Sequence, residues 1–288
     1  MCVFGDSLSD AGNVFEVTHT VANRPYDLIP SAPYPIGGMT FSNGRTWIQQ
    51  LAESLKMKQS VAPAFRNRGT FCNYAFGGAR AHATSPFDLP GQVSFYLGDF
   101  GMKSSDGTLF VILIGGNDIR DAIEAFQADL TGGTSAQTIT DAITSVFTNV
   151  LALYGSAGER QFLIPNAPNL ALVPAITLQG QDAQFLADLL SNTYNTALED
   201  ALVGIEALLQ DPELQITRFD TATFLASIVT TPPQGISNAT DTCITPGAKS
   251  KAICKTPGEY IFWDGVHPTQ AAHGLVAEAV EAILDPPN

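Results

Sequence analysis

Basic residues are scarce in this sequence of 288 residues. Lysine and arginine together number 14, against 28 aspartates and glutamates, so the formal net charge is −14. Because nucleic acids and anionic membrane surfaces attract proteins through basic residues, this balance argues against both as partners. The excess acid is most simply explained by solubility, and it also fits a substrate that is neutral or cationic.

Long apolar runs are missing as well. No stretch reaches the roughly 18–20 apolar residues of a transmembrane helix, and the apolar run at 108–114 ends in glycines. The chain begins almost directly on a strand-like run, without the basic and apolar regions of a signal peptide. Either the protein has no signal peptide or the sequence starts after one, with Met1 as an added start, and we expect the second.

Cysteine is rare, with four residues. Cys243 and Cys254 lie close together in a loop, and we expect a disulfide there rather than two free thiols, because an even count suits an oxidising compartment. Cys2 and Cys72 lie in apolar strand-like runs, and we expect small buried core residues there rather than a bridge. The spacing of the four does not match a zinc site. These features favour a secreted or exported protein, extracellular or periplasmic.

Apolar runs without alternation recur along the chain, as expected for strands buried on both faces. The five runs are residues 1–5, 70–76, 109–114, 161–165 and 214–219. Helical patterns lie between and after them, at 46–55, 93–100, 118–130, 136–154, 182–209 and 270–284. This alternation predicts an α/β fold, a single three-layer sandwich domain over residues 1–288 with helices on both faces of a parallel sheet.

Two kinds of segment interrupt this pattern. Residues 230–255 are rich in Thr, Pro, Gly and Lys and should form a surface excursion, which contains a glycosylation sequon at Asn238. Glycine-containing segments at 5–7, 77–78 and 115–117 come where apolar runs stop. Ligands of such sheets bind beyond the carboxyl ends of the strands, so we expect these three segments to meet at one edge.

Ser7 follows the first run, where a serine gains from backbone N–H groups and a helix dipole, or simply caps a helix. Near the other end of the chain, His267 lies in a loop between Asp264 and Pro268. Asp264 is close enough to accept a hydrogen bond from one ring nitrogen, although an ordinary turn contact is the alternative. A hydroxyl, an imidazole and a carboxylate are the parts of a nucleophilic hydrolase. His273, in the last helical pattern, is expected to be structural or exposed.

Donors for a developing negative charge are also present. The bare N–H groups of Gly77-Gly78 can approach a ligand closely, and the Asn117 carboxamide can donate through its nitrogen. In acyl transfer each such donor contributes about 3–4 kcal/mol. Turn geometry for the glycines and a helix N-cap for Asn117 are the simpler alternatives.

Taken together, these segments resemble the GDSL, or SGNH, family of serine esterases and lipases. Gly-Asp-Ser-Leu-Ser-Asp at 5–10 matches the first block of the family, and Asn-Tyr-Ala-Phe-Gly-Gly-Ala at 73–79 resembles the second. Gly-Gly-Asn-Asp at 115–118 matches the third, and Asp-Gly-Val-His at 264–267 the fifth. A lone Gly-Asp-Ser is a weak signal, whereas four blocks in order span nearly the whole chain. The Pro-rich segment at 165–170 is similar to the lipase-like branch.

The resemblance implies a flavodoxin-like three-layer α/β/α sandwich around a five-stranded parallel sheet. It implies a serine hydrolase that cleaves carboxylic esters through an acyl-enzyme on Ser7, with Asp264 and His267 completing a catalytic triad. The Ser7 N–H, the Gly78 N–H and the Asn117 side chain would form the oxyanion hole. No metal and no cofactor are implied, and the partner would be a small-molecule or lipid ester.

Four polar residues of the same blocks, Asp6, Asp10, Asn13 and Asp118, are interpreted as a scaffold that holds the loops around Ser7 and Asn117. An apolar acyl pocket could come from the segment at 19–43, and we expect short or medium acyl chains. Three alternatives remain at this stage: a phospholipase or acyltransferase, a polysaccharide acetylesterase, and a non-catalytic ligand-binding module with the same fold.

Overall fold

The computed structural model of the chain describes residues 1–101, 107–158 and 160–284. One parallel sheet has the strand order β1-β2-β3-β4. Its strands are β1 (Cys2–Gly5), β2 (Leu109–Leu113), β3 (Gln161–Pro165) and β4 (Gln215–Phe219). A second, two-stranded parallel sheet pairs β5 (Asn238–Thr242) with β6 (Tyr260–Phe262).

Helices make up most of the remaining regular structure. The α-helices are α1 (Asn13–Thr18), α2 (Trp47–Ser54), α3 (Leu89–Phe100), α4 (Gly116–Ala128), α5 (Gly133–Ala157), α6 (Pro174–Thr177), α7 (Gln181–Leu209), α8 (Thr221–Thr230) and α9 (Gln270–Leu284). Within the described ranges, none of them is long and apolar enough to span a membrane.

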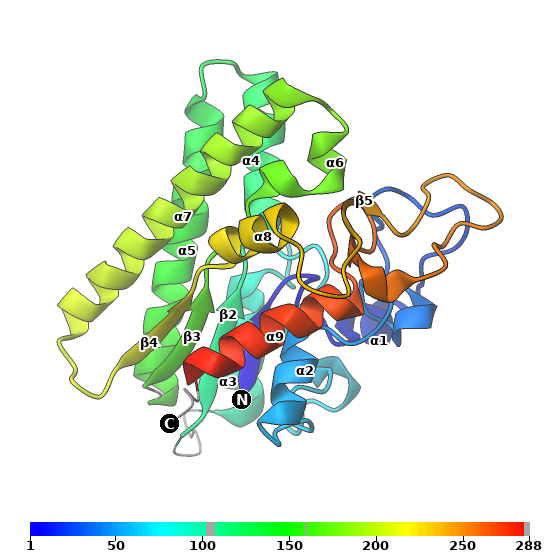
Figure 1. Cartoon of the computed structure of the whole chain (residues 1–288). Coiled ribbons are helices and arrows are strands. Elements are labelled where there is room, and N and C mark those ends of the chain that lie inside the picture. The colour runs from blue at the N-terminus through cyan, green and yellow to red at the C-terminus, as the bar shows by residue number, and fades with distance from the viewer. Residues whose placement is uncertain (102–106, 159, 285–288) are drawn as a thin grey trace.

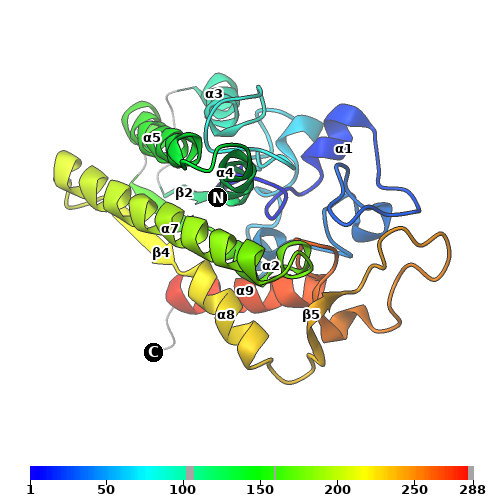
Figure 2. The ribbon, with the colours of Figure 1, turned by 90° about the horizontal axis from the view of Figure 1, so that it is seen from above.

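Alternate strand residues pack on opposite faces of the main sheet. Phe4 and Phe110 belong to a core cluster shared with α3, α4, α5 and α7, whereas Val3 and Val111 belong to a second cluster shared with α2 and α9. Figures 1 and 2 show these two groups of helices on either side of the strands. Because both faces are buried, the strands are apolar throughout rather than alternating. The predicted three-layer α/β sandwich is confirmed.

The strand predicted at 70–76 is absent from the four-stranded sheet, although its backbone lies where a fifth strand would lie. Val3 donates its N–H to Cys72 O, and Tyr74 donates its N–H to Val3 O. Only one parallel bridge, Val3 to Asn73, results on this edge. Phe76 also donates its N–H to Gly5 O, but the Gly5 N–H is bonded to the Gln92 side chain at 2.9 Å instead of to a carbonyl of this segment, which leaves the ladder irregular.

The cysteine pairing differs from the prediction for Cys2 and Cys72, which form a disulfide. The extended segment beside β1 brings their Cα atoms to 4.7 Å, within the range that a disulfide requires. The two residues are 70 positions apart, so their proximity depends on the pairing of two segments rather than on local sequence. The predicted bridge between Cys243 and Cys254 is confirmed.

The excursion at 230–255 is more than a surface loop. It contributes β5, and Cys243, Ile244 and Ala252 are buried in a small core cluster with Tyr34 and Trp263. The Cys243–Cys254 disulfide lies in this cluster, and the neighbouring Ile244 donates its N–H to Trp263 O, one residue before Asp264. The excursion therefore supports the C-terminal part of the candidate site.

Removing each disulfide should destabilise the fold according to the length of chain it closes. The sequence separations of the two disulfides are 70 and 11 residues. In the chain-entropy account, Cys2→Ala/Cys72→Ala should therefore lower the free energy of unfolding by about 4 kcal/mol, and Cys243→Ala/Cys254→Ala should lower it by about 3 kcal/mol. Urea denaturation of both double variants beside the wild type measures the two losses. A smaller loss for the Cys2/Cys72 pair would contradict this expectation.

Candidate active site

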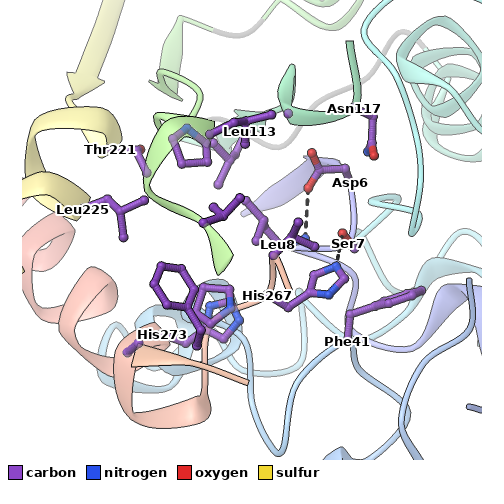
Figure 3. Close-up of a pocket in the computed structure, with 18 of the residues that line it drawn as sticks. Asp6, Ser7, Leu8, Phe41, Leu113, Asn117, Thr221, Leu225, His267 and His273 are labelled. Atoms are coloured by element: carbon purple, nitrogen blue, oxygen red, sulfur yellow. Dashed lines mark hydrogen bonds between the residues drawn. The ribbon is translucent and has the colours of Figure 1, made fainter. Parts of the chain in front are cut away.

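A cavity of about 360 Å³ opens at the carboxyl edge of the main sheet. Its lining comes from the loop after β1, the segment at 29–31, Gly77 and Gly78, the start of α4, the loop after β3, α8, and the stretch from β6 into α9. A volume near 300–1,000 Å³ is usual for small-molecule sites. The three glycine-containing segments predicted to converge all contribute to this lining, as Figure 3 illustrates for Ser7 and Asn117.

Ser7, His267 and Asp264 form one hydrogen-bonded chain at this cavity. Ser7 Oγ lies 2.8 Å from His267 Nε2, and His267 Nδ1 lies 2.8 Å from Asp264 Oδ2 (Figure 3 shows the first contact). Because the carboxylate only accepts, Nδ1 carries the proton, and Nε2 is left to accept from the serine hydroxyl. Asp264 and His267 are almost fully buried, so the imidazole is held in one orientation.

The turn that carries the acid and the imidazole is fixed by its own backbone. Asp264 Oδ1 accepts from the N–H groups of Val266 at 3.0 Å and His267 at 2.9 Å. Gly265 donates its N–H to Leu28 O at 2.7 Å. A Cβ at position 265 would lie 2.6 Å from that oxygen, so a larger residue would push the turn away. The glycine between Asp264 and Val266 is thus required by packing.

Tyr34 is a further residue of the site, and the sequence placed it only among possible acyl-pocket residues. Its hydroxyl donates to Asp264 Oδ2 at 2.9 Å, and the ring is fully buried between Tyr26 and Trp263. Burial and the neighbouring Asp264 carboxylate raise the pKa of Tyr34 well above its usual value, so it remains a donor. No short sequence motif could reveal this contact, because it joins residues 230 positions apart.

Three candidate oxyanion donors line the cavity. The N–H groups of Ser7 and Gly78 make no hydrogen bond within the described residues. Asn117 Nδ2 donates one hydrogen to Ala79 O at 2.8 Å, which leaves its second hydrogen free. Gly78 has φ of +80°, a conformation that other residues adopt only under strain. Negative charge developing on a bound carbonyl oxygen would meet these donors.

The loops beneath Ser7 are held by the predicted scaffold residues. The buried Asp10 carboxylate accepts from the N–H groups of Gly12, Asn13 and Val14 at 2.6–3.2 Å and from Gly77 at 3.0 Å. Asn13 Nδ2 donates to the carbonyl oxygens of Asn73 and Ala75. These bonds tie the first sequence block to the second. The scaffold interpretation of Asp10 and Asn13 agrees with these contacts.

Asp118 anchors the start of α4 in the same way. Its carboxylate accepts from the N–H groups of Ala81 and His82 and lies 2.6 Å from His82 Nδ1. This contact raises the pKa of His82. Asp118 thus fixes the first turn of α4, which also carries Asn117. His82, which showed no motif in the sequence, belongs to this support.

His273 also lines the cavity, outside the hydrogen-bonded chain of Ser7, His267 and Asp264. It is buried on α9, and burial together with the nearby His267 lowers its pKa to about 3. It is therefore neutral near pH 7. Figure 3 shows it on the same side of the cavity as Leu225. We expected His273 to be structural or exposed. It is packed in the interior, as a structural residue would be, and it also lines the cavity.

The apolar wall of the cavity comes mainly from elements other than the segment at 19–43. That segment supplies Ile29, Pro30, Ser31 and Phe41, but Ile36 is half exposed and does not line the cavity. The larger apolar contribution consists of Leu170, Val173, Phe224, Leu225, Ile228, Phe262 and Val276. The expected acyl segment thus provides only part of the wall, because the far end is built by α8 and α9.

Asp6, next to Ser7, makes a testable contribution to pH dependence. Burial raises the pKa of Asp6 from 3.8 to about 6, despite the hydrogen bond that it accepts from Leu8 N–H. The folded state therefore holds this proton more tightly than the unfolded state. The stabilising contribution of the protonated Asp6 to the free energy of unfolding is fully present below pH 4 and is lost as the pH rises through about 6. The shift corresponds to at most about 3 kcal/mol.

Asp6→Asn removes the buried charge and can keep the acceptor for Leu8. We expect this variant to be about 1–3 kcal/mol more stable than the wild type at pH 8 and to lose that advantage by pH 4. Urea denaturation at pH 4, 6 and 8 gives the difference directly. An advantage that is larger at pH 4 than at pH 8 would refute the assigned direction.

Comparisons with known proteins agree with this arrangement. The sequence model of the GDSL-like lipase/acylhydrolase family matches residues 1–280. Two GDSL esterase/lipases of Arabidopsis thaliana are 28% and 27% identical, each over 96% of this chain and over 85% and 84% of their own lengths. A putative GDSL-like lipase from Parabacteroides merdae shares the fold, with a TM-score of 0.51, 14% identity, and coverage of 96% of this chain and 92% of that one.

The family match extends over nearly the whole chain and includes all the segments that meet at the cavity. The chain therefore belongs to the GDSL-like lipase/acylhydrolase family and is a carboxylic ester hydrolase.

Proposed function

We propose that Ser7 is the nucleophile of this ester hydrolase, with His267 as its base and Asp264 as the orienting acid. The observation that carries the proposal is the 2.8 Å contact between Ser7 Oγ and His267 Nε2, at a cavity with unpaired N–H donors. Ser7 Oγ attacks the ester carbonyl carbon while its proton passes to Nε2. Asp264 stabilises the imidazolium that results.

The tetrahedral intermediate carries its negative charge on the former carbonyl oxygen. The N–H groups of Ser7 and Gly78 and the free hydrogen of Asn117 Nδ2 stabilise this charge. The bond to the alcohol oxygen then breaks, and His267 returns its proton to the leaving alcohol. Water, giving a proton to Nε2, attacks the acyl-enzyme, and the carboxylic acid leaves as Ser7 regains its hydrogen.

We infer that the acyl chain lies against the apolar wall formed by α8 and α9. Leu225, Phe224 and Val276 line that side of the cavity, and burial of each methylene there contributes about 0.8 kcal/mol. The natural substrate is proposed to be an ester of a short or medium acyl chain. Polysaccharide acetyl esters and phospholipids remain candidates within the same chemistry, and acyl-length dependence separates them.

A secreted or exported location is proposed together with this activity. All four cysteines are paired in two disulfides. Such bonds persist in oxidising compartments and are rare in the cytosol. Western blotting of culture medium and cell fractions for the protein expressed in its source organism tests the location.

Ser7→Ala should abolish ester turnover and leave the fold intact, because the substitution removes only a cavity-facing hydroxyl. Initial rates on p-nitrophenyl acetate and butyrate, with the melting temperature of both proteins, provide the measurement. Activity of the variant near the wild-type level would exclude Ser7 as the nucleophile. Loss of activity with a large drop in melting temperature would require Ser7→Cys as a second variant, tested with a serine-directed phosphonate on the wild type.

Leu225→Trp should shorten the apolar end of the cavity. We expect kcat/KM on p-nitrophenyl octanoate to fall at least tenfold relative to acetate, because several methylenes lose their apolar contacts. Leu189→Trp, at an exposed position of α7 outside the cavity, is the matched control. Equal loss on both esters would argue against an acyl chain at Leu225.

A further inference from the structure

Arg120 lies in the wall of the cavity, on the first turns of α4. It follows Asn117 by three positions, and residues three apart on a helix share a face. Its side chain is partly buried. Arg120 therefore contributes to the same wall of the cavity as Asn117.

Arg120 differs from the other arginines in having no partner. Six of the eight form ion pairs, namely Arg45, Arg66, Arg68, Arg80, Arg160 and Arg218. Arg24 lies over the ring of Tyr26. Within the described residues, Arg120 makes neither a hydrogen bond nor an ion pair. In a chain with 28 acidic residues, an arginine at the candidate active site that has none of them as a partner is available to a ligand.

The neighbouring charges do not satisfy Arg120. The Arg120 charge lowers the pKa of Asp6 slightly, although burial has a larger and opposite effect. No hydrogen bond joins Asp6 and Arg120 within the described residues. The cavity's other arginine, Arg80, is bonded through two nitrogens to Asp121. Arg120 thus retains all five N–H donors for a group that enters the cavity.

The position of Arg120 indicates which part of an ester it would meet. Apolar residues gather on one side of the cavity, where Figure 3 shows Leu225 and His273 beyond Leu8. Asn117 lies on the other side, near Ser7. With the acyl chain against the apolar side, the alcohol part of the ester extends towards α4 and Arg120.

We propose that Arg120 binds an anionic group, a phosphate or a carboxylate, on the alcohol part of the ester substrate. The planar guanidinium matches the paired oxygens of both groups. The net charge of −14 does not attract an anionic substrate over a long distance. Arg120 therefore discriminates between anionic and neutral esters at short range, once the substrate is in the cavity. This inference rests on the proposed function, because it places the ester by the position of Ser7.

The test compares anionic and neutral esters of matched structure. One pair is 4-acetoxybenzoate and 4-acetoxybenzamide, and the other is dihexanoylglycerol 3-phosphate and dihexanoylglycerol. For each pair, the ratio of kcat/KM for the anionic ester to that for the neutral ester is measured for wild type, Arg120→Ala and Arg120→Lys. Arg66→Ala, which removes an arginine outside the cavity lining, is the matched control.

Arg120→Ala should lower this ratio about tenfold to a hundredfold for at least one pair, chiefly through KM. Arg120→Lys should restore part of it, and Arg66→Ala should keep it. The pair that responds identifies phosphate or carboxylate as the preferred group. Added NaCl should lower the wild-type ratio but not that of Arg120→Ala. An equal loss on neutral and anionic esters, or no loss on either anionic ester, would overturn the proposal.

Measurements of ligand binding test the anion site of Arg120 independently of the proposed catalytic function. If the wild type hydrolyses none of the four esters, the proposed function fails for these substrates, and calorimetry with 4-hydroxybenzoate and glycerol 3-phosphate still tests Arg120. Weaker binding of either anion to Arg120→Ala than to wild type supports the anion site. Equal binding to both proteins refutes it.

Discussion

The position of β1 in the parallel arrangement is the constraint on which the rest of the site depends. β1 pairs with β2 on one side and bonds to the extended segment at Cys72–Phe76 on the other. Because parallel segments end at the same edge, Ser7, Gly78 and Asn117 follow three neighbouring backbones and reach one cavity. The Cys2–Cys72 disulfide joins two of these backbones covalently. The proposed oxyanion donors are thus set by the fold before any substrate binds.

Buried carboxylates then hold the loops that leave this edge. Asp10 and Asp118 accept several backbone N–H groups, and Asp264 accepts from its own turn, from His267 and from Tyr34. A buried charge is costly unless it is well hydrogen-bonded. Burial raises the pKa of Asp6 and of Asp10 to about 6, which shows that the compensation is incomplete there. Preorganised loops around Ser7 are therefore obtained at some expense of stability near neutral pH.

The cavity combines two environments. Apolar side chains from α8 and α9 line one side, and unpaired donors, including Arg120 of α4, line the other. A carboxylic ester has the same division, with an apolar acyl chain and a polar alcohol. The family defines the bond that is cleaved. We propose that selection among esters depends on the apolar wall and on Arg120, which lie outside the four family blocks.

Much of this protein is determined by local sequence. The apolar runs and helical patterns predict the three-layer sandwich because burial on both sheet faces requires them, and the Gly-Asp-Ser and Asp-Gly-Val-His segments predict the residues at the cavity. Only the tertiary structure decided the Cys2–Cys72 bridge, the contact of Tyr34 with Asp264, the irregular backbone in place of a fifth strand, and the unpaired state of Arg120. Each of these depends on segments distant in sequence that meet in space. Periodicity and short motifs carry information about neighbours along the chain, and not about which distant partner a side chain finds or lacks.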